Sequence, residues 1–423
     1  IMEKHKMKKI VLLSERLPYP PTSGTKNLLY NYCKILHEKL NLEVINISFL
    51  EQDENISAKP DFISRVYTMP NPSGKTKIKN IILKTFIKRE YPLQVSLFWD
   101  PAIKEKIDDI IRDERPDYVI ADFIRTTEYL KDYTGYKIAD LQDLLSLRYE
   151  RQLKVDLRTI NPYGAYLFRL PKFAQTVLQL SFIKKCVMRM EIKLLKKFEL
   201  DVGKHYDRVM FVARKEGNLF DEMLGEKKSL IVPLGVDYPF FSQNLNLKKK
   251  EKSIAFMGAL NVAHNENGIT HFIEHCFPAI REQVPGVKLF IIGGGASDKL
   301  KQYEANDVIF MGRVPDVRIA VGECKVFICP LQFGSGIKTK NLEAMAMGIT
   351  VVTTPIGAEN IDAVDGVQWV IGNTDISFSS QVVSLLKDEK LRKTIGENGR
   401  KFVRDNFSWK VAEKSFMEVF TNE

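Results

Sequence analysis

The sequence predicts an α/β protein built from two Rossmann-like, doubly wound domains. Short runs of apolar and β-branched residues alternate with segments of helical periodicity, as expected for parallel strands covered by helices on both faces. This alternation restarts after residue 232. The chain has 423 residues, 44% of them hydrophobic, which is enough to bury two separate cores. Because such domains bind ligands at the C-terminal ends of their strands, we expect these ends to face a shared cleft.

The first domain contains strands that are continuously apolar. The predicted strands are KKIVLLSE, LEVINISF, DYVIAD, KIADL and DRVMFV. Helical periodicity covers residues 26–40, 102–113 and 186–203. Continuous rather than alternating hydrophobicity favours a parallel sheet that is buried on both faces.

The second domain repeats this organisation. Its predicted strands are SIAFMG, VKLFIIGG, DVIFMG, KVFICP, TVVTT and VQWVI. The segment VPLGVDYPFF (232–241) interrupts the alternation with two prolines and a glycine, and a lysine run follows at 248–250. We therefore predict one domain over 1–232 and a second domain over 233–404.

Composition restricts the environment and the partners. The net charge of +10 favours nucleic acid, an acidic lipid surface or a phosphorylated small molecule. The five cysteines form no C-x-x-C pair, which favours a reduced, cytoplasmic environment. The apolar run at 10–13 is too short for a signal peptide, and no run has the length of a bilayer span. We expect a cytoplasmic protein that is soluble or peripheral on a membrane.

The stretch FGSGIKTKNLEAMAMG (333–348) combines glycines, lysines and a carboxylate. Gly334 and Gly336 lie in the predicted strand-to-helix turn, where a missing Cβ lets backbone N–H groups approach an anion. Lys338 and Lys340 add full charges, and Glu343 lies on roughly the same helical face. We predict that the turn binds the phosphates of a nucleoside diphosphate and that Glu343 accepts hydrogen bonds from ribose. The alternative is an ordinary helix start with solvated lysines.

Other turns of the second domain also carry glycines. Gly258 follows its first strand, and Gly293 and Gly294 follow its second. Asp298 stands where a G-x-G-x-x-G fingerprint needs its last glycine, so the dinucleotide motif is incomplete. The turn MGRVPD (311–316) is placed to contact a base through backbone groups.

These motifs resemble a known family. FMGAL, IIGGG, GRVPDV, GSGIKTKNLEAMAMG and VVTTP follow the order and spacing of family-four retaining glycosyltransferases, which have the two-domain GT-B architecture. ERLPYPPTSGTK resembles the first-strand loop of that family, and PLGVD resembles its interdomain linker. FVRDNFSWKVAEKSF resembles the closing helices, which implies that residues 405–423 pack back on the first domain.

The resemblance implies an acceptor-binding N-terminal domain over 1–232 and a nucleotide-sugar-binding C-terminal domain over 233–404, which holds the donor site for a nucleotide-diphosphate sugar. Glu343 would bind the ribose, the segment 336–338 would hold the diphosphate, and Arg313 and Val314 would flank the base. The predicted donor-binding residues are Gly24, Gly258, Gly293, Gly294, Arg313, Val314, Ser335, Gly336, Ile337, Lys338, Thr339, Lys340 and Glu343.

Two departures from the family pattern concern this donor site. Ser335 stands where the family has the first glutamate of a pair. Ala259 and Asn265 occupy positions where an arginine and a lysine are common. We expect Lys338 and Lys340 to compensate for the missing positive charge.

The resemblance implies transfer of a sugar to a hydroxyl with retention of configuration. Lysines and helix N–H groups aimed at the leaving diphosphate would stabilise its developing charge. The predicted catalytic residues are Lys338, Glu343 and Asp122; either Asp122 or Asp143 could orient the acceptor, and a plain strand-end carboxylate is the alternative for each. No metal or other cofactor is expected. His271, His275 and Cys276 are close in sequence but lack a further ligand cluster, so we expect a structural role.

Two other classes of function remain open at this stage. A nucleotide-sugar epimerase of the same architecture would keep the phosphate and ribose contacts but would need acid–base carboxylates. A nucleic-acid-binding protein is suggested by charge alone, and the chain shows no known reading motif. We therefore expect a sugar donor and a glycan or lipid-linked acceptor of bacterial surface polysaccharide synthesis as partners, and no nucleic acid.

Residues 151–200 concentrate the positive charge, with eleven Lys and Arg against three acidic residues. Aromatic and aliphatic residues are interleaved with them around Pro162 and Pro171. Such a composition favours a segment that lies in a membrane interface. The alternative is that the apolar residues belong to the core and the lysines are solvated.

Overall fold

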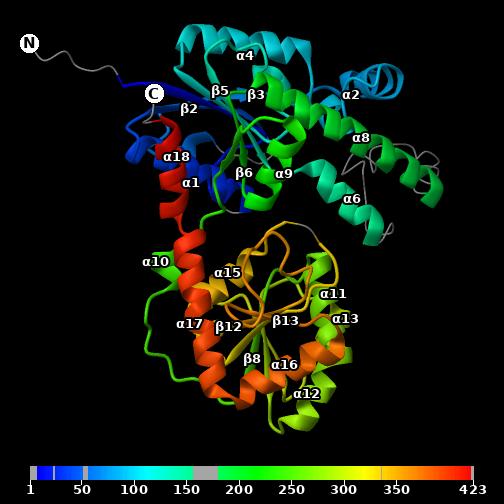
Figure 1. Cartoon of the computed structure of the whole chain (residues 1–423), viewed down its shortest axis with the longest axis vertical. Helices are drawn as coiled ribbons and strands as arrows, with labels where there is room; N and C mark the ends of the chain where they lie inside the picture. The colour runs from blue at the N-terminus through cyan, green and yellow to red at the C-terminus, as the bar shows by residue number, and fades with distance from the viewer. Residues whose placement is uncertain (1–6, 22–23, 51–55, 156–179, 335, 421–423) are drawn as a thin grey trace, which may run out of the picture. The chain divides into compact units, whose positions relative to one another are not determined.

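The computed structural model describes residues 7–21, 24–50, 56–155, 180–334 and 336–420. The chain forms two compact units, one of residues 1–233 with 413–423 and the other of residues 234–412. Each unit contains one sheet with helices around it (Figure 1). The α/β class with two doubly wound domains is therefore confirmed.

The first unit contains a seven-stranded sheet in the order β3-β2-β1-β4-β5-β6-β7. All neighbouring strands are parallel. The strands are β1 Lys9–Ser14, β2 Glu43–Phe49, β3 Arg65–Met69, β4 Tyr118–Asp122, β5 Tyr136–Gln142, β6 Arg208–Phe211 and β7 Ser229–Ile231. The sequence predicted five of them. The two that it missed, β3 and β7, are short edge strands that are only partly buried, so they lack the continuous apolar run of the central strands.

Helices connect these strands on both faces of the sheet. They are α1 Gly24–Glu38, η1 Ile56–Ala58, α2 Gly74–Asn80, the π-helix η2 Ile81–Ile87, α3 Leu93–Ser96, α4 Pro101–Glu114, α5 Thr127–Leu130, α6 Leu145–Val155, α8 Ser181–His205 and α9 Arg214–Leu224. Asp100 caps α4 by accepting a hydrogen bond from the Ala102 N–H at 3.0 Å. Three of these helices, α1, α4 and α8, correspond to the segments predicted from periodicity.

The second unit contains a six-stranded sheet in the order β10-β9-β8-β11-β12-β13. Its strands, all parallel, are β8 Ser253–Met257, β9 Lys288–Ile292, β10 Val308–Gly312, β11 Val326–Cys329, β12 Thr350–Thr353 and β13 Val370–Ile371. Its helices are α10 Tyr238–Phe241, α11 Ala263–His271, η4 Phe272–Cys276, α12 Phe277–Gln283, α13 Asp298–Lys301, α14 Val317–Gly322, α15 Thr339–Ala346, α16 Asp375–Lys387 and α17 Glu389–Asn406. The last helix, α18 Trp409–Phe420, begins in this unit and continues in the first.

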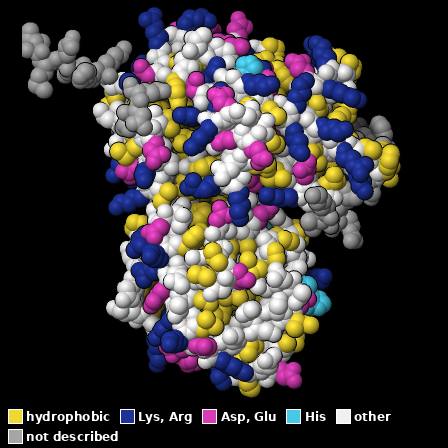
Figure 2. Space-filling model, viewed as in Figure 1, with side chains coloured by type: hydrophobic (Ala, Val, Ile, Leu, Met, Phe, Trp, Pro, Cys, Tyr) yellow, Lys and Arg dark blue, Asp and Glu magenta, His cyan; other side chains and the backbone are white. Residues whose placement is uncertain are grey.

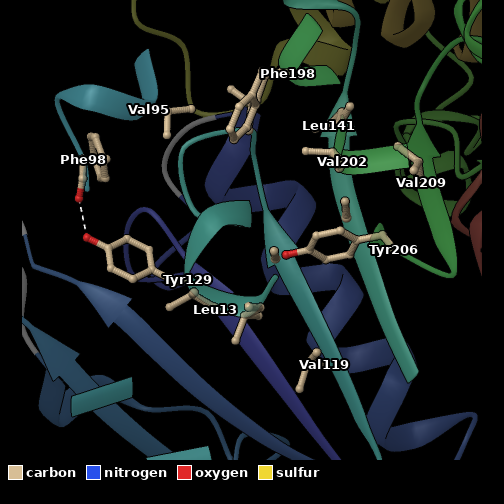
Figure 3. Packing of buried hydrophobic residues seen from close by; sticks show 14 of the residues in the cluster. Leu13, Val95, Phe98, Val119, Tyr129, Leu141, Phe198, Val202, Tyr206 and Val209 are labelled. Atoms are coloured by element: carbon tan, nitrogen blue, oxygen red, sulfur yellow. Dashed lines mark hydrogen bonds between the residues drawn. The ribbon is translucent and has the colours of Figure 1, made fainter. Parts of the chain in front are cut away.

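Buried apolar side chains fill the space between each sheet and its helices, while Lys and Arg side chains are spread over the visible surface (Figure 2). Figure 3 shows part of the first core, where two tyrosines are fully buried among aliphatic residues. The Tyr206 hydroxyl donates to the Thr127 carbonyl oxygen at 2.6 Å, and the Tyr129 hydroxyl donates to the Phe98 carbonyl oxygen. Both buried hydroxyls are thereby satisfied.

The C-terminal chain rejoins the first unit at residue 413, whereas we predicted residue 405. Residues 413–423 belong to the first unit, where the Phe416 ring lies 5.0 Å from the Tyr32 ring. Residues 405–412 belong to the second unit. The Val236 N–H donates to the Phe407 carbonyl oxygen at 2.6 Å, so this part of the chain pairs with the segment after the boundary. None of the described helices is both long and apolar enough to cross a bilayer.

Candidate nucleotide-binding site

Two glycine turns of the second unit lie directly against each other. Gly258 follows β8 and Gly293 follows β9, and the Gly258 N–H donates to the Ile292 carbonyl oxygen at 2.9 Å. Gly293 has a φ of 144°, and a Cβ on it would lie 1.8 Å from the Gly258 carbonyl oxygen. Glycine is therefore required at Gly293 by both backbone conformation and space. This packing brings the carboxyl ends of two central strands together.

Arg313 lies beside the same turns. A Cβ on Gly294 would lie 2.9 Å from the Arg313 Cγ, so the aliphatic part of the arginine runs over the glycine backbone. Val314, predicted to flank a base, packs against the core of the unit instead. Because the Val314 side chain is packed in the core, a ligand could contact this residue only through its backbone groups.

Lys340 reaches back from α15 to the turn after β8. Its Nζ donates to Asn265 Oδ1 at 2.5 Å and lies 4.8 Å from the centroid of the Phe256 ring. A Cβ on Gly258 would lie 2.8 Å from this Nζ. Burial lowers the pKa of Lys340. An ammonium group thus stands beside Asn265, the position where a lysine of the family is missing.

Lys338 lies at the start of α15 and is also buried. Its Nζ donates to the Gly336 carbonyl oxygen at 2.6 Å. Gly334 and Gly336 have φ values of 122° and 77°, which favour glycine at both positions, and Ile337 packs against the core. Gly348 has a φ of 74°, as predicted for the residue that ends the helix. Ser335 lies outside the described residues.

His264 joins this site without having been predicted. The Cβ position of Gly334 lies 3.6 Å from the His264 ring. The pKa of His264 is lowered to about 4, first by burial and then by the charges of Lys340 and Lys338. Its imidazole is therefore neutral at physiological pH, so one ring nitrogen can donate a hydrogen bond and the other can accept one. The sequence signal that would have found it is its place after the Gly258 turn.

Glu343 stands on α15 close to Lys340, half-buried. Burial raises the pKa of Glu343 to about 7, and the charge of Lys340 partly offsets this shift. Its carboxylate accepts no hydrogen bond from the described residues, so its acceptor capacity is available to a ligand. Thr339 begins α15 and is half-buried.

Asp122 lies in the first unit, at the end of β4. Its Oδ1 accepts a hydrogen bond from Gln142 Nε2 at 3.0 Å, and its buried Oδ2 has no partner among the described atoms. Asp140, on β5, is in register with it and also has an unpaired buried Oδ2. Burial is the main cause that raises the pKa of Asp122 to about 7, followed by Glu15. Two buried carboxyls thus stand next to each other; the sequence did not suggest Asp140.

The remaining predicted residues have more ordinary roles. Asp143 accepts a hydrogen bond from Arg148 Nε at 2.8 Å, so this salt bridge already engages its carboxylate. Gly24 is the first residue of α1, with open space at its Cβ position. His271 Nε2 lies 2.8 Å from Asp375 Oδ1, a link between α11 and α16.

Known proteins resemble this chain in sequence. The family model "Glycosyl transferases group 1" matches residues 251–388. An uncharacterised 44.6 kDa protein of the cps region of Klebsiella pneumoniae is 27% identical over 252 residues, covering 57% of this chain and 62% of that protein. The capsular polysaccharide biosynthesis glycosyltransferase CapM of Staphylococcus aureus is 28% identical over 155 residues, covering 34% and 40%. The chain spans less than two thirds of the length of these relatives.

Solved structures share the fold over nearly the whole chain. HepE of Anabaena, in complex with UDP, has a TM-score of 0.63 at 12% identity and covers 98% of this chain and 100% of its own. Sucrose-phosphate synthase of Thermosynechococcus elongatus has a TM-score of 0.65 at 15% identity and covers 98% of both chains. The chain has the two-domain GT-B fold, and residues 251–388 of its second unit match the model of the glycosyl transferases group 1 family.

Proposed function

We propose that this protein is a retaining glycosyltransferase. It moves a sugar from a nucleotide-diphosphate donor to a hydroxyl of a glycan or lipid-linked acceptor in bacterial surface polysaccharide synthesis. The observation that carries the proposal is the convergence of Lys338, Lys340 and His264 beside two glycine turns, with a free carboxylate on Glu343. CapM supports the polysaccharide class, and the UDP in HepE supports the type of donor.

The chemistry follows from the charges at this site. The donor diphosphate lies against the turn that contains Gly336 and receives backbone N–H groups at the start of α15. When the bond to the sugar breaks, negative charge grows on the diphosphate. The ammonium groups of Lys338 and Lys340 stabilise that charge because they are already held in place. Glu343 holds the ribose hydroxyls, and Arg313 lies toward the base.

In this scheme the acceptor oxygen bonds to the sugar carbon as the bond to the diphosphate breaks, and the acceptor proton moves to an oxygen of the departing phosphate, so no protein nucleophile or general base is required. Asp122 is fully buried, so it can position an acceptor only through a neighbouring group such as Gln142, which donates to its Oδ1. Because two lysines supply the positive charge, the reaction proceeds without a bound metal. Donor turnover is therefore expected to continue in the presence of EDTA, and a loss that Mg²⁺ restores would contradict this part of the proposal.

The membrane stretch that we predicted at 151–200 lies partly outside the described residues, which exclude 156–179. Its described part includes the beginning of α8, where Phe182, Lys185 and Arg189 are exposed. This arrangement supports a peripheral position on the cytoplasmic face of a membrane, where a lipid-linked acceptor would be found.

A thermal-shift screen against UDP-, GDP- and ADP-sugars tests the donor class, because a ligand that binds only the native state raises the melting temperature. Turnover is then measured with and without acceptor. Sugar transfer that requires an acceptor supports the proposal. Conversion of the donor without any acceptor would indicate an epimerase instead.

A further inference from the structure

Helix α2 and the π-helix η2 of the first unit expose a row of apolar side chains and bury the polar residues Asn80 and Thr85. Ile78, Ile82, Leu83, Phe86 and Ile87 recur at intervals of one, three and four residues along Gly74–Ile87, and each is exposed, up to 66% for Ile87. A helix that packs on a soluble core has the opposite pattern, with its apolar stripe inward. This stripe is named the α2–η2 face.

Polar groups hold the other side of these helices against the protein. Asn80 is buried, and its Nδ2 donates to the carbonyl oxygens of Ser96 at 3.1 Å and Trp99 at 2.7 Å. Thr85 is fully buried, with its Oγ1 2.7 Å from Ser96 Oγ. Specific hydrogen bonds to the segment 96–99 therefore fix the helices with their apolar residues pointing outward. The way these helices pack therefore leaves their apolar residues exposed to solvent.

The charge along this face is mostly positive, and the exposed Glu90 just beyond its end is paired with Lys84 at 3.5 Å. Residues 74–89 contain six basic residues and no acidic residue. The Lys84 side chain packs against the protein surface, where its Nζ lies 4.1 Å from the centroid of the Tyr91 ring. The four exposed members of the set lie at the two ends of the face and between its apolar residues: Lys75, Lys79, Lys88 and Arg89. In Figure 2, dark blue side chains with yellow between them cover the part of the first unit where Figure 1 places α2.

We propose that the α2–η2 face docks on a bilayer surface that contains anionic lipids. The apolar side chains enter the boundary between headgroups and acyl chains, and the four exposed cations remain at the level of the headgroup phosphates. A second copy of the chain is a poor occupant, because a symmetric contact would bring like charges together. A bilayer satisfies both the apolar and the cationic parts of the face at once.

Co-sedimentation of the full chain with vesicles, without donor or acceptor, tests this proposal. Neutral phosphatidylcholine vesicles are compared with vesicles that also contain phosphatidylglycerol, at low and high salt. We expect binding that needs the anionic lipid and weakens with salt. Each cation near an anionic leaflet strengthens binding about fivefold, so losing three of them weakens it roughly a hundredfold, and reversing their charge is expected to weaken it by at least that factor.

The charge variant and its control each change three exposed lysines to glutamate. The variant combines Lys75→Glu, Lys79→Glu and Lys88→Glu. The control makes the same change in net charge on the second unit and combines Lys288→Glu, Lys390→Glu and Lys401→Glu. A loss of binding in the variant alone supports the α2–η2 face. Equal losses in both would mean that only total charge matters and would overturn the proposal.

A fluorescent label tests whether the apolar residues enter the bilayer. Cys186 is the one exposed cysteine, and the other four are buried, so Cys186→Ser gives a background for labelling. A polarity-sensitive dye is attached through Ile82→Cys, or through Ile376→Cys on α16, which is 82% exposed. We expect anionic vesicles to shift the emission to the blue at position 82 only. No shift at position 82, or self-association that depends on Phe86 without vesicle binding, would refute the proposal.

Discussion

At the scale of single residues, burial raises the pKa of Glu343 into the neutral pH range. Because the pKa of this carboxyl is raised to about 7, a growing fraction is neutral as the pH falls below 7. Ribose hydroxyls donate to the ionised form more strongly. We therefore expect donor affinity to weaken as the pH falls from 8 to 6, reaching about tenfold per unit well below the pKa.

The variant Glu343→Gln provides the control for this pH dependence, because its amide keeps an acceptor oxygen and does not titrate in this range. Calorimetric titration of the donor at several pH values measures both proteins. The proton on the donor phosphates affects both equally, so only their difference reports on Glu343. Parallel curves for the two proteins would show that Glu343 does not hold the donor.

Asp122 is expected to make the stability of the first unit depend on pH. The pKa of Asp122 is about 7 in the folded protein, whereas the pKa of an Asp in an unfolded chain is about 4. Between these values the unfolded state binds fewer protons, so stability falls as the pH rises through this window. The variant Asp122→Asn removes the charge that has to be buried beside Asp140.

Thermal unfolding at pH 5 and pH 8 checks this prediction. Glu191 and Glu199 also have pKa values raised to about 7 by burial, so the wild-type melting temperature alone is not decisive. The useful quantity is the difference between Asp122→Asn and wild type. We expect this difference to favour the variant more at pH 8 than at pH 5. A difference that is constant with pH would mean that Asp122 is not the titrating group.

At the scale of elements, the contact between the turns after β8 and β9 is the most sensitive part of the candidate site. Gly293→Ala would place a Cβ 1.8 Å from the Gly258 carbonyl oxygen, so one turn has to move. We expect a loss of stability of more than about 1 kcal/mol and weaker donor binding. Gly286→Ala is the matched control, since its φ is also positive, at 81°, but its Cβ position is open. Equal effects of the two changes on donor binding would contradict the importance of this contact.

The sequence predicted the elements whose signals are local. The turn and helix of 333–348 were predicted because glycines, lysines and a helix-ending glycine act over a few residues. His264 was missed, and the contact of Asn265 with Lys340 was not foreseen, because only the folded chain brings α11 to Lys340. The α2–η2 face was missed for a different reason. Its apolar periodicity indicates a helix but not which side is buried, and here hydrogen bonds of Asn80 and Thr85 decide this.

At the scale of the whole molecule, the sequence predicted both parallel sheets because their central strands are continuously apolar. The division of the C-terminal helices was harder to predict. Every apolar residue from 402 to 419 needs a partner, but the sequence does not say which unit supplies it. In the structure Phe407 pairs with the segment after the boundary, and Phe416 packs on Tyr32 of the first unit.

The central claim is that the second unit binds a nucleoside diphosphate through the lysines and Glu343 of the stretch 333–348. Titration calorimetry with UDP and GDP, and with their nucleosides, tests it most directly on the wild type, Lys340→Ala, Glu343→Ala and the control Lys299→Ala, whose lysine is exposed on α13. We predict that one diphosphate binds roughly ten- to a hundredfold more weakly to the Lys340 and Glu343 variants, since each loses a charge-assisted interaction. The nucleoside should lose affinity only with Glu343→Ala. Unchanged affinity in both variants, or an equal loss in Lys299→Ala, would contradict the claim.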